Sequence, residues 1–381
     1  MPRAAIESAT IIASFLVQRL HYRHQLPTRF NPRKILVAKL DHLGDVLLAT
    51  PVFANLRCAY PNAQIHALVG RWGAEAIRNH PDVDTIIRYD APFFCRRGHS
   101  TRPREVLRLF RDLQREQYDL LIDLRGNWLT VIFALFKTAA YRLALASLQV
   151  VSKLGHSCFT NPHEVERNLD VLRSAHIPTP DNTPIFHTTP ADQRWADDFL
   201  SNSGIVSGCP LVAIHSASPV TLKRWRAERF AAVADWLTEQ RRAQILFVGV
   251  KSELPVVAEI QKQMRRKSLN IVGETTLSQL AEILKRCNLF IGNDSGPMHL
   301  AAAVGTRTIG LYGPGNPERF GPVGSHCRTI RRKPDCPPCM ETFCKFGGEG
   351  CMKEIRVEDV IQVIASIVSH TTFNPVWGKD E

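Results

Sequence analysis

The stretch FIGNDSGPMHLAAAVGT (residues 290–306) joins an apolar strand to an alanine-rich helix through small polar residues. Pro297 suits the first turn of that helix, because the N–H group that proline lacks would have no partner there. The free main-chain N–H groups and the helix dipole make such a terminus a binding site for phosphate. We therefore expect Ser295 and His299 to donate hydrogen bonds to phosphate or sugar oxygens, and Asp294 to cap the helix.

Strand and helix alternate in the same way along most of the chain. Short runs rich in isoleucine, valine and leucine predict strands at 34–38, 64–69, 119–123, 211–215, 244–249, 289–292 and 307–312. Helical patterns fall between them, at 46–60, 104–116, 228–242 and 277–287. Strands that alternate with helices form parallel sheets with both faces covered, so we predict an α/β fold.

The alternation breaks at IPTPDNTPIFHTTPAD (177–192), which has four prolines and no periodicity and predicts a linker. We predict one doubly wound domain at 31–185 and a second at 186–355, with an amphipathic extension at 1–30 and a helix and tail at 356–381. A chain of 381 residues is long enough for two cores. Ligands of such domains bind beyond the carboxyl ends of the strands, and we expect them in a cleft between the two domains.

The composition and net charge of the chain limit the kinds of molecule that it can bind. Hydrophobic residues make up 44% of the chain and charged residues 22%, as in ordinary soluble globular proteins. The net charge of +12 favours an anionic partner, but the sequence carries no nucleic-acid-binding signature, and we expect no nucleic acid partner. No run of eighteen apolar residues is present, so we expect no transmembrane helix.

The segment IESATIIASFLVQRLHYRH (6–24) spaces its apolar residues as one face of a helix does and ends in a basic flank. Two structures fit this pattern equally well: a helix lying on an anionic membrane surface, and a helix packed on the first domain. The segment lacks the continuous apolar region and the cleavage site of a signal peptide. We therefore expect a cytoplasmic protein, which the first structure would bring to the inner membrane as a peripheral protein.

A second turn from strand to helix lies in KILVAKLDHLGDVLLATP (34–51). Gly44 allows a close approach of the backbone or of a ligand, and Asp45 lies at the N-terminus of the following helix. A carboxylate in that place often does no more than cap the helix. Asp41, four residues earlier, could play the same part, so position alone does not choose between the two carboxylates.

With both turns in view, the sequence resembles glycosyltransferase family 9, the ADP-heptose:lipopolysaccharide heptosyltransferases. The resemblance rests on ILVAKLDHLGDVLLATPVFANLRCAYPNAQIHALV (35–69) and IGNDSGPMHLAAAVGTRTIGLYGPGNPERFGP (291–322). Two further landmarks lie between them, YDLLIDLRGN (118–127) and AIHSASPVTLKRWRAERFAAVADWL (213–237). The resemblance thus covers residues 30–355 in the family's order.

The resemblance implies a GT-B fold, in which two Rossmann-like domains face a cleft. The N-terminal domain would bind the acceptor and the C-terminal domain the nucleotide sugar. It also implies inversion at the anomeric carbon, with no divalent metal or other cofactor required for catalysis. The general base of the family's Leu-Gly-Asp turn falls on Asp45, which selects it over Asp41. A carboxylate fits that role, because the attacking hydroxyl needs a base within hydrogen-bond reach.

The same comparison implies a donor site. The family's phosphate-binding lysine, just before a tryptophan, matches Lys223, although lysine is commonly only a solvated surface charge. Glu253 falls where an acidic residue takes ribose hydroxyls. The other positions implied to bind the donor are Ser216, Ser218, Asp294, Ser295, Gly296 and His299.

One position departs from the family pattern. Where the family usually has Asp-x-Gln-Gly, this chain has Asp123-Leu-Arg125-Gly. A guanidinium there would suit an anionic glycolipid acceptor, such as a phosphorylated or carboxylated saccharide. Arg96 and Arg97 lie in the basic stretch 95–115 and would extend this acceptor side, unless the stretch is only a solvated face.

Four of the ten cysteines cluster in CPPCMETFCKFGGEGC (336–351), as Cys336, Cys339, Cys344 and Cys351. A Cys-x2-Cys pair with two further thiols fits a structural zinc or iron site, and some protein-heptosylating relatives carry a metal finger here. The alternative is a loop stabilised by reduced or partly disulfide-bonded thiols, since the later spacings match no standard finger. We expect no catalytic role for the cluster.

These features predict an enzyme that moves heptose, or a similar sugar, from ADP-heptose to lipopolysaccharide core or another cell-envelope glycan. Three alternatives share them. A protein heptosyltransferase of the autotransporter type would use the same donor site, and the cysteine cluster favours it. A GT-B sugar-nucleotide epimerase would convert the free donor without an acceptor. A regulator would bind the nucleotide sugar without turnover.

Overall fold

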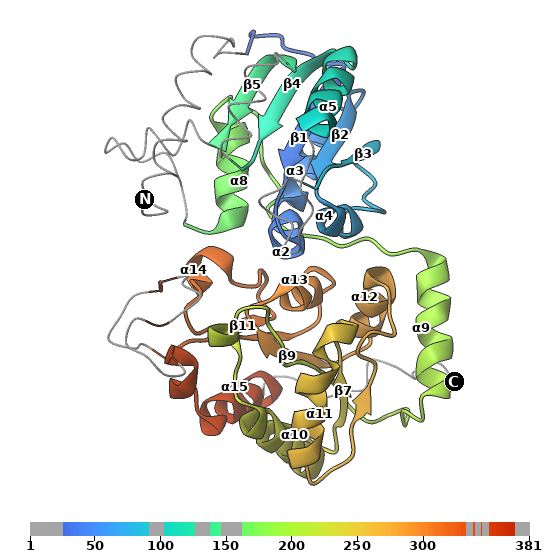
Figure 1. The fold of residues 1–381 in the computed structure, drawn as a ribbon, viewed down its shortest axis with the longest axis vertical. Helices are drawn as coiled ribbons and strands as arrows, with labels where there is room; N and C mark the ends of the chain where they lie inside the picture. The colour runs from blue at the N-terminus through green and yellow to red at the C-terminus, as the bar shows by residue number, and fades with distance from the viewer. Residues whose placement is uncertain are drawn as a thin grey trace. The chain divides into compact units, whose positions relative to one another are not determined.

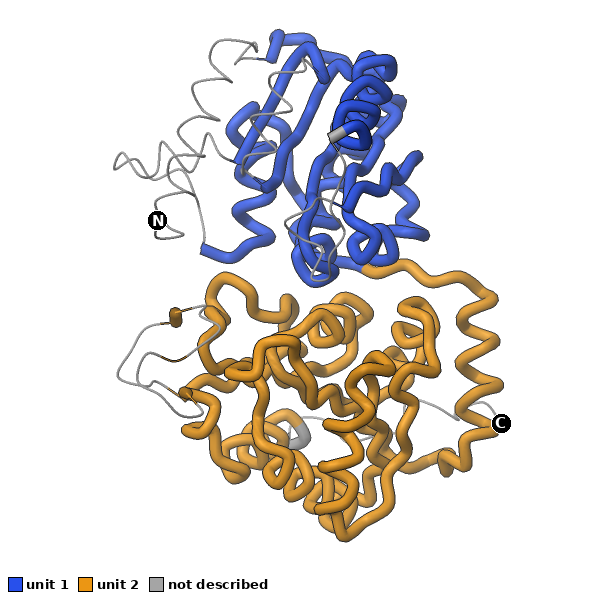
Figure 2. Tube along the Cα trace, in the orientation of Figure 1, with its two compact units in different colours: residues 1–185 blue, residues 186–381 orange. Residues whose placement is uncertain are grey.

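The computed structural model describes residues 26–90, 103–125, 138–145, 162–332, 338–339, 344 and 350–369. The chain divides into two compact units, residues 1–185 and 186–381 (Figure 2). The segment 6–24, for which we expected an amphipathic helix, lies outside the described residues. None of the helices in the described ranges has the length and apolarity that crossing a bilayer requires.

A five-stranded parallel sheet forms the centre of the first unit, in the order β3-β2-β1-β4-β5 (Figure 1). The strands are β1 (Lys34–Lys39), β2 (Gln64–Val69), β3 (Thr85–Arg88), β4 (Tyr118–Asp123) and β5 (Ala139–Ala144). The central strand β1 is buried from Ile35 onward. Both of its edges are paired, with Ile35 opposite Ile65 of β2 and Leu120 of β4. A central strand needs apolar side chains on both faces, which explains its continuous apolar run.

The helices in the described part of the first unit are α2 (Leu43–Leu47), α3 (Thr50–Ala59), α4 (Arg71–Ala76), α5 (Pro103–Arg115) and α8 (Glu164–Arg173). The single helix that we expected over 46–60 is two helices, α2 and α3. Pro51 causes the break, because proline lacks an N–H and its ring clashes with the carbonyl four residues earlier, here that of Leu47. Helices α2 and α4 pack side by side (Figure 1).

The second unit contains a six-stranded parallel sheet in the order β8-β7-β6-β9-β10-β11. The strands are β6 (Leu211–His215), β7 (Gln244–Phe247), β8 (Leu269–Asn270), β9 (Leu289–Asn293), β10 (Thr308–Leu311) and β11 (Cys327–Ile330). Counted along this unit the order is 3-2-1-4-5-6, which is the order of the dinucleotide-binding folds. Two doubly wound units confirm the predicted fold class.

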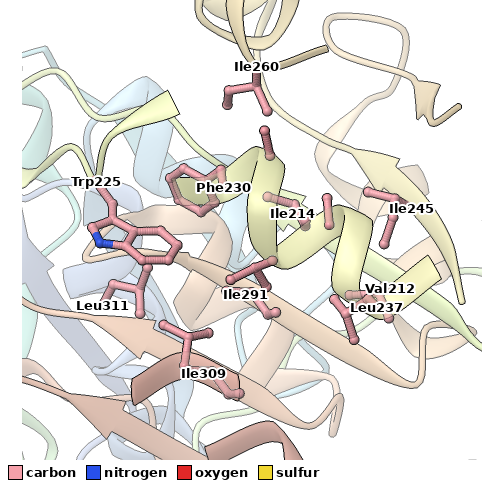
Figure 3. Packing of buried hydrophobic residues seen from close by; sticks show 14 of the residues in the cluster. Val212, Ile214, Trp225, Phe230, Leu237, Ile245, Ile260, Ile291, Ile309 and Leu311 are labelled. Carbon is pink, nitrogen blue, oxygen red and sulfur yellow. The ribbon is translucent and has the colours of Figure 1, made fainter. Parts of the chain in front are cut away.

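The α-helices of the second unit are α9 (Pro190–Asn202), α10 (Ala227–Arg241), α11 (Leu254–Gln263), α12 (Leu277–Lys285), α13 (Gly296–Ala303), α14 (Pro317–Phe320) and α15 (Val357–Ser369). The described part of this unit also has the 3₁₀ helices η1 (Thr221–Lys223), η2 (Lys251–Glu253) and η3 (Gly350–Glu354). Figure 3 shows Trp225 and Phe230 packed over Ile291 of the sheet. Their rings meet edge to face, with centroids 5.0 Å apart.

All seven predicted strands are present, with ends that differ by one or two residues. The segment 177–189 has no regular secondary structure, as its prolines predicted, and α9 begins at Pro190. The sequence patterns missed β3, β5, β8 and β11.

Candidate active site

Each sheet has a topological switch point, where the strand order reverses. In the first unit it lies between β1 and β4, and in the second between β6 and β9. Ligands of doubly wound sheets bind beyond the carboxyl ends of the strands at such a point. The predicted catalytic residue Asp45 follows β1, and the predicted donor residues Ser216 and Asp294 follow β6 and β9.

Asp45 lies in the first turn of α2, which begins at Leu43, four residues after the end of β1 at Lys39. His42 is the N-cap residue, and its extended conformation (φ −71°, ψ 166°) turns the chain from strand to helix. Burial raises the pKa of the Asp45 carboxyl above its ordinary value; attraction to Lys39 opposes the rise, and repulsion from Glu164 adds to it. A raised pKa makes a carboxylate a stronger base, which is what a general base at neutral pH requires.

A buried lysine lies at the end of β1. The Nζ of Lys39 donates hydrogen bonds to the Leu124 main-chain oxygen at 3.2 Å, to Glu164 Oε1 at 3.1 Å and to Asn168 Oδ1 at 3.2 Å. Three acceptors satisfy the three hydrogens of an ammonium group, so this charge is fully paired although its side chain is only 2% exposed. Because Glu164 and Asn168 belong to α8, the network ties α8 to the turn that carries Asp45.

Asp41 is held very differently from Asp45. Its carboxylate forms an ion pair with Arg125, and its Oδ2 lies 3.5 Å from Lys39 Nζ. Arg125 also donates to the Leu40 main-chain oxygen, and burial lowers the pKa of its guanidinium to about 9. The guanidinium that we predicted for acceptor binding therefore holds the β1 turn in this structure.

Asp123, at the end of β4, supports Arg125 in turn. Its Oδ1 accepts a hydrogen bond from the main-chain N–H of Arg125 at 3.1 Å, and its Oδ2 accepts one from Arg142 at 2.9 Å. Both side chains of the Asp123–Arg142 pair are almost fully buried. The other predicted acceptor residues, Arg96 and Arg97, lie outside the described residues.

The N-terminus of α13 follows β9 directly. Ser295 is the N-cap residue, in an extended conformation (φ −159°, ψ 167°), and its side chain makes no capping hydrogen bond. The capping role that we expected for Asp294 is wrong. Instead, Asp294 Oδ2 accepts a hydrogen bond from Lys223 Nζ at 2.5 Å, because a cation is a stronger partner than main-chain N–H groups. Lys223, the predicted phosphate ligand, is thus brought to the start of α13.

Asn293 fixes the segments around this turn and was given no role by the sequence. Its Oδ1 accepts from the Trp225 main-chain N–H at 3.1 Å, and its Nδ2 donates to the Ser216 main-chain oxygen at 2.7 Å. Trp225 Nε1 donates to the Ile355 main-chain oxygen at 2.9 Å. The end of β6, the end of β9 and the segment after Lys223 therefore form one hydrogen-bonded unit.

His215, the last residue of β6, connects two of the predicted donor residues. Its Nδ1 lies 3.0 Å from Ser295 Oγ and its Nε2 lies 3.2 Å from Glu253 Oε2. Glu253 Oε2 also accepts from the Val250 main-chain N–H at 2.9 Å. Burial opposes the ionisation of Glu253, but these bonds outweigh it and hold the pKa of Glu253 below its ordinary value. Sequence reasoning missed His215, whose only signal was that of a polar residue at the end of an apolar strand.

The remaining predicted donor residues lie on the same segments. Ser216 is buried, and its Oγ has no hydrogen-bond partner within the described part of the chain. Ser218 Oγ accepts from the Val220 main-chain N–H at 3.3 Å. Gly296 opens α13, and His299, one turn further, is buried. A buried hydroxyl without a partner at the end of β6 is a polar group that a ligand could satisfy.

The cysteine cluster is only partly described. Cys336 lies outside the described residues, Cys339 is exposed, and Cys344 and Cys351 are half-buried. Among the residues that the structure describes, no group of three or more His, Cys, Asp or Glu side chains is arranged to hold a metal ion. The metal site therefore stays a prediction. Helix η3, which carries Cys351, packs against η1, which carries Lys223.

Comparison with known proteins gives one consistent result. The family model for glycosyltransferase family 9 (heptosyltransferase) matches residues 106–349. Lipooligosaccharide heptosyltransferase 2 of Campylobacter jejuni subsp. jejuni serotype O:6 is 31% identical over 342 residues, which cover 88% of this chain and 99% of that protein. Lipopolysaccharide core heptosyltransferase OpsX of Haemophilus influenzae is 26% identical over 351 residues, 87% of this chain and 95% of that protein. The crystal structure of the glycosyl transferase family 9 from Veillonella parvula superposes with a TM-score of 0.78 at 26% identity, over 90% of this chain and 99% of that one.

Proposed function

Because the chain belongs to glycosyltransferase family 9, and is therefore a glycosyltransferase of GT-B fold, we propose that it transfers heptose from ADP-heptose to a hydroxyl of lipopolysaccharide core. A similar sugar or another cell-envelope glycan would use the same chemistry. The names of the relatives support this donor sugar and this class of acceptor. The observation that carries the proposal is the position of Asp45, a carboxyl with a raised pKa at the switch point of the first unit.

We propose a single displacement with inversion. The oxygen of the acceptor hydroxyl attacks the anomeric carbon, and its proton goes to the Asp45 carboxylate. The bond between the anomeric carbon and the diphosphate oxygen breaks, and its electron pair leaves with ADP. Lys223 and the N-terminus of α13 stabilise the negative charge that develops on the diphosphate, so that the chain's own groups supply the positive charge this step needs.

The contacts of the two carboxylates support Asp45 as the base. Asp41 lies against two cations, Arg125 and Lys39, so its carboxylate is committed to structural ion pairs. Asp45 makes no such ion pair with the residues that the structure describes, and burial favours its protonated form.

The contacts of Lys223 support it as a phosphate ligand. An ammonium group has three hydrogens, and the structure gives Lys223 one carboxylate acceptor, Asp294. Asp294 thereby positions the ammonium at the start of α13 while leaving it hydrogens for a phosphate. In this proposal Glu253 takes the ribose hydroxyls, and Ser216, with its unpartnered Oγ, lies within the same donor site.

We also propose that the enzyme acts in the cytoplasm, at the inner membrane. The proposed acceptor is a glycolipid, and the net charge of +12 favours contact with an anionic surface.

The test is a transfer assay with ADP-heptose and lipopolysaccharide core that lacks heptose. We expect ADP to be released and the acceptor to gain the mass of one heptose. The Asp45→Asn variant should lose transfer and still bind ADP, and loss of both together would contradict the base assignment. Transfer to a glycan-free polypeptide would identify a protein heptosyltransferase, and conversion of the donor without acceptor would identify an epimerase.

A further inference from the structure

Three side chains of the second unit form a continuous hydrogen-bonded chain, Ser295–His215–Glu253. The His215 imidazole is only 4% exposed and bridges the other two, with Nδ1 3.0 Å from Ser295 Oγ and Nε2 3.2 Å from Glu253 Oε2. The partners come from distant parts of the sequence, 80 and 38 residues from the histidine. The imidazole therefore links the N-cap residue of α13 to the proposed ribose ligand.

The acceptor character of Glu253 decides where the proton of a neutral imidazole lies. An ionised carboxylate can only accept hydrogen bonds, so the bond to Glu253 places the hydrogen on Nε2. Nδ1 then carries a lone pair and must accept the hydroxyl hydrogen of Ser295. In this state the single hydrogen of Ser295 is directed at His215 and is not available to a ligand.

A phosphate bound at the N-terminus of α13 would compete with His215 Nδ1 for the hydroxyl hydrogen of Ser295. Phosphate oxygens accept hydrogen bonds, so Ser295 can bind one only by turning its hydrogen away from Nδ1. The bond between Ser295 and His215 survives if Nδ1 gains a proton and becomes the donor. We propose that His215 takes up this proton from the solvent when a nucleoside diphosphate binds, and so acts as a positioning residue that makes Ser295 a hydrogen-bond donor to phosphate.

The inference rests on the proposed function, because it places the donor's diphosphate at α13. The charged or titratable side chains on the segments that meet here include Glu253 and Lys251 of η2, Arg224, Lys223, Asp294 and His299. Of these residue types only histidine ordinarily titrates between pH 5 and 8, so any proton uptake by His299 must be distinguished from the proton uptake that we propose for His215. Removing the Ser295 hydroxyl distinguishes the two histidines, because that hydroxyl contacts the His215 ring.

The measurement is calorimetric titration of the full chain with ADP, in two buffers of different ionisation enthalpy. For the wild type we expect net proton uptake, and an ADP affinity that weakens as pH rises. The sign follows from linkage, because a complex that binds more protons than the free protein is favoured at low pH. The phosphate of ADP itself titrates near pH 6 and contributes equally to every variant. The readout is therefore the difference between wild type and variant.

Two variants test the role of the ring. His215→Asn keeps a polar group near Ser295 but cannot gain a proton, and Ser295→Ala keeps the histidine but removes its partner. Between about pH 6 and 8 we expect the wild-type affinity to fall about tenfold more than that of either variant. His326→Gln is the matched control: this histidine contacts the Ala302 main-chain oxygen in α13, and we expect wild-type proton uptake.

Each outcome of these titrations supports or overturns the proposed role of His215. Equal pH dependence in the wild type and both variants would overturn the role of His215 and leave the proposed function standing. Absence of ADP binding by the wild type at any pH would overturn both. If His215→Asn does not fold, Ser295→Ala alone gives the answer. It removes only the hydroxyl of the N-cap residue of α13 and leaves the His215 ring in place.

Discussion

Lys223 Nζ lies 2.5 Å from Asp294 Oδ2, and the two side chains are 19% and 10% exposed. The pair neutralises a cation and an anion that would both be costly to bury alone. It also fixes the direction of the lysine, which extends from η1 to the start of α13. The cation is thus in place at the helix terminus before an anionic ligand arrives, and little side-chain ordering remains to be done on binding.

The first prediction concerns this lysine. Lys223→Ala should weaken ADP binding by about 10- to 100-fold, because a hydrogen bond between a charged donor and phosphate contributes about 1.5–3 kcal/mol. Isothermal titration calorimetry measures the loss, and adenosine, which has no phosphate, should bind both proteins equally. Arg265→Ala removes the same charge from an exposed position of the same unit and should leave the ADP affinity unchanged. A similar loss in both variants would show that net charge, and not position, sets the affinity.

The second prediction separates catalysis from stability at Asp45. Asp45→Asn should lower kcat by about 10²- to 10⁴-fold, the usual contribution of a general base. The same variant should have a higher Tm at neutral pH. The pKa of Asp45 is raised by burial, so the folded state carries an unfavourable charge at any pH above that pKa, and the asparagine removes it.

Asp41→Asn is the control for this variant and should act in the opposite direction. It removes a carboxylate that pairs with Arg125 and Lys39, so the Tm should fall. A fall of Tm in both variants would contradict the difference in environment that distinguishes the two carboxylates.

The third prediction is a pH profile. Because Asp45 must be ionised to accept a proton, kcat/KM should rise with pH through its raised pKa and then level off. Glu164→Gln removes a negative charge that raises this pKa, so the acid limb should move to lower pH. Glu166→Gln, on the same helix but bonded to Arg173 and Asn182, should leave the limb in place. If the acid limb of the profile does not move in Glu164→Gln, the limb reports the ionisation of a group other than Asp45.

The fourth prediction concerns the packing of α2. A methyl group on Gly73 of α4 would lie 2.7 Å from Val46 Cγ2, next to Asp45 in α2, and valine has little freedom to rotate away. Gly73→Ala should therefore displace α2 and lower both Tm and kcat. Val46→Ala removes the clashing methyl, so Gly73→Ala should do much less harm in that background. A double-mutant cycle of Tm and kcat measures this coupling, and additive effects would refute it.

The sequence patterns found every central strand and missed every edge strand. Strands β3 and β5 are the edges of the first sheet, and β8 and β11 are the edges of the second. A strand paired on both sides and covered on both faces must be apolar throughout, and its composition then reveals it. An edge strand is partly exposed: in β3 neither Thr85 nor Arg88 is buried. Its composition therefore resembles that of a loop.

The candidate site was predictable in part, for a related reason. The motifs placed Asp45 and Ser295 at strand-to-helix turns, because such turns have local patterns of glycine, proline and small polar residues. They could not reveal that Asp41 pairs with Arg125, which lies 84 residues later in the sequence. Nor could they reveal that His215 joins Ser295 to Glu253. These contacts depend on which strands become neighbours, which no local spacing encodes.

In the proposed mechanism, the two switch points divide the chemistry between the cores of the two units. The cluster that includes Leu36, Phe110 and Tyr118 lies wholly in the first unit, and the cluster around Trp225 lies wholly in the second. Substitutions that reshape the turn around Asp45 therefore need not disturb the packing beneath Lys223 and Ser295. In the proposed function Asp45 acts on the acceptor and Lys223 holds the donor, so a lineage of such enzymes could change its acceptor and keep its nucleotide sugar. Sequence differences between relatives should then concentrate in the first unit.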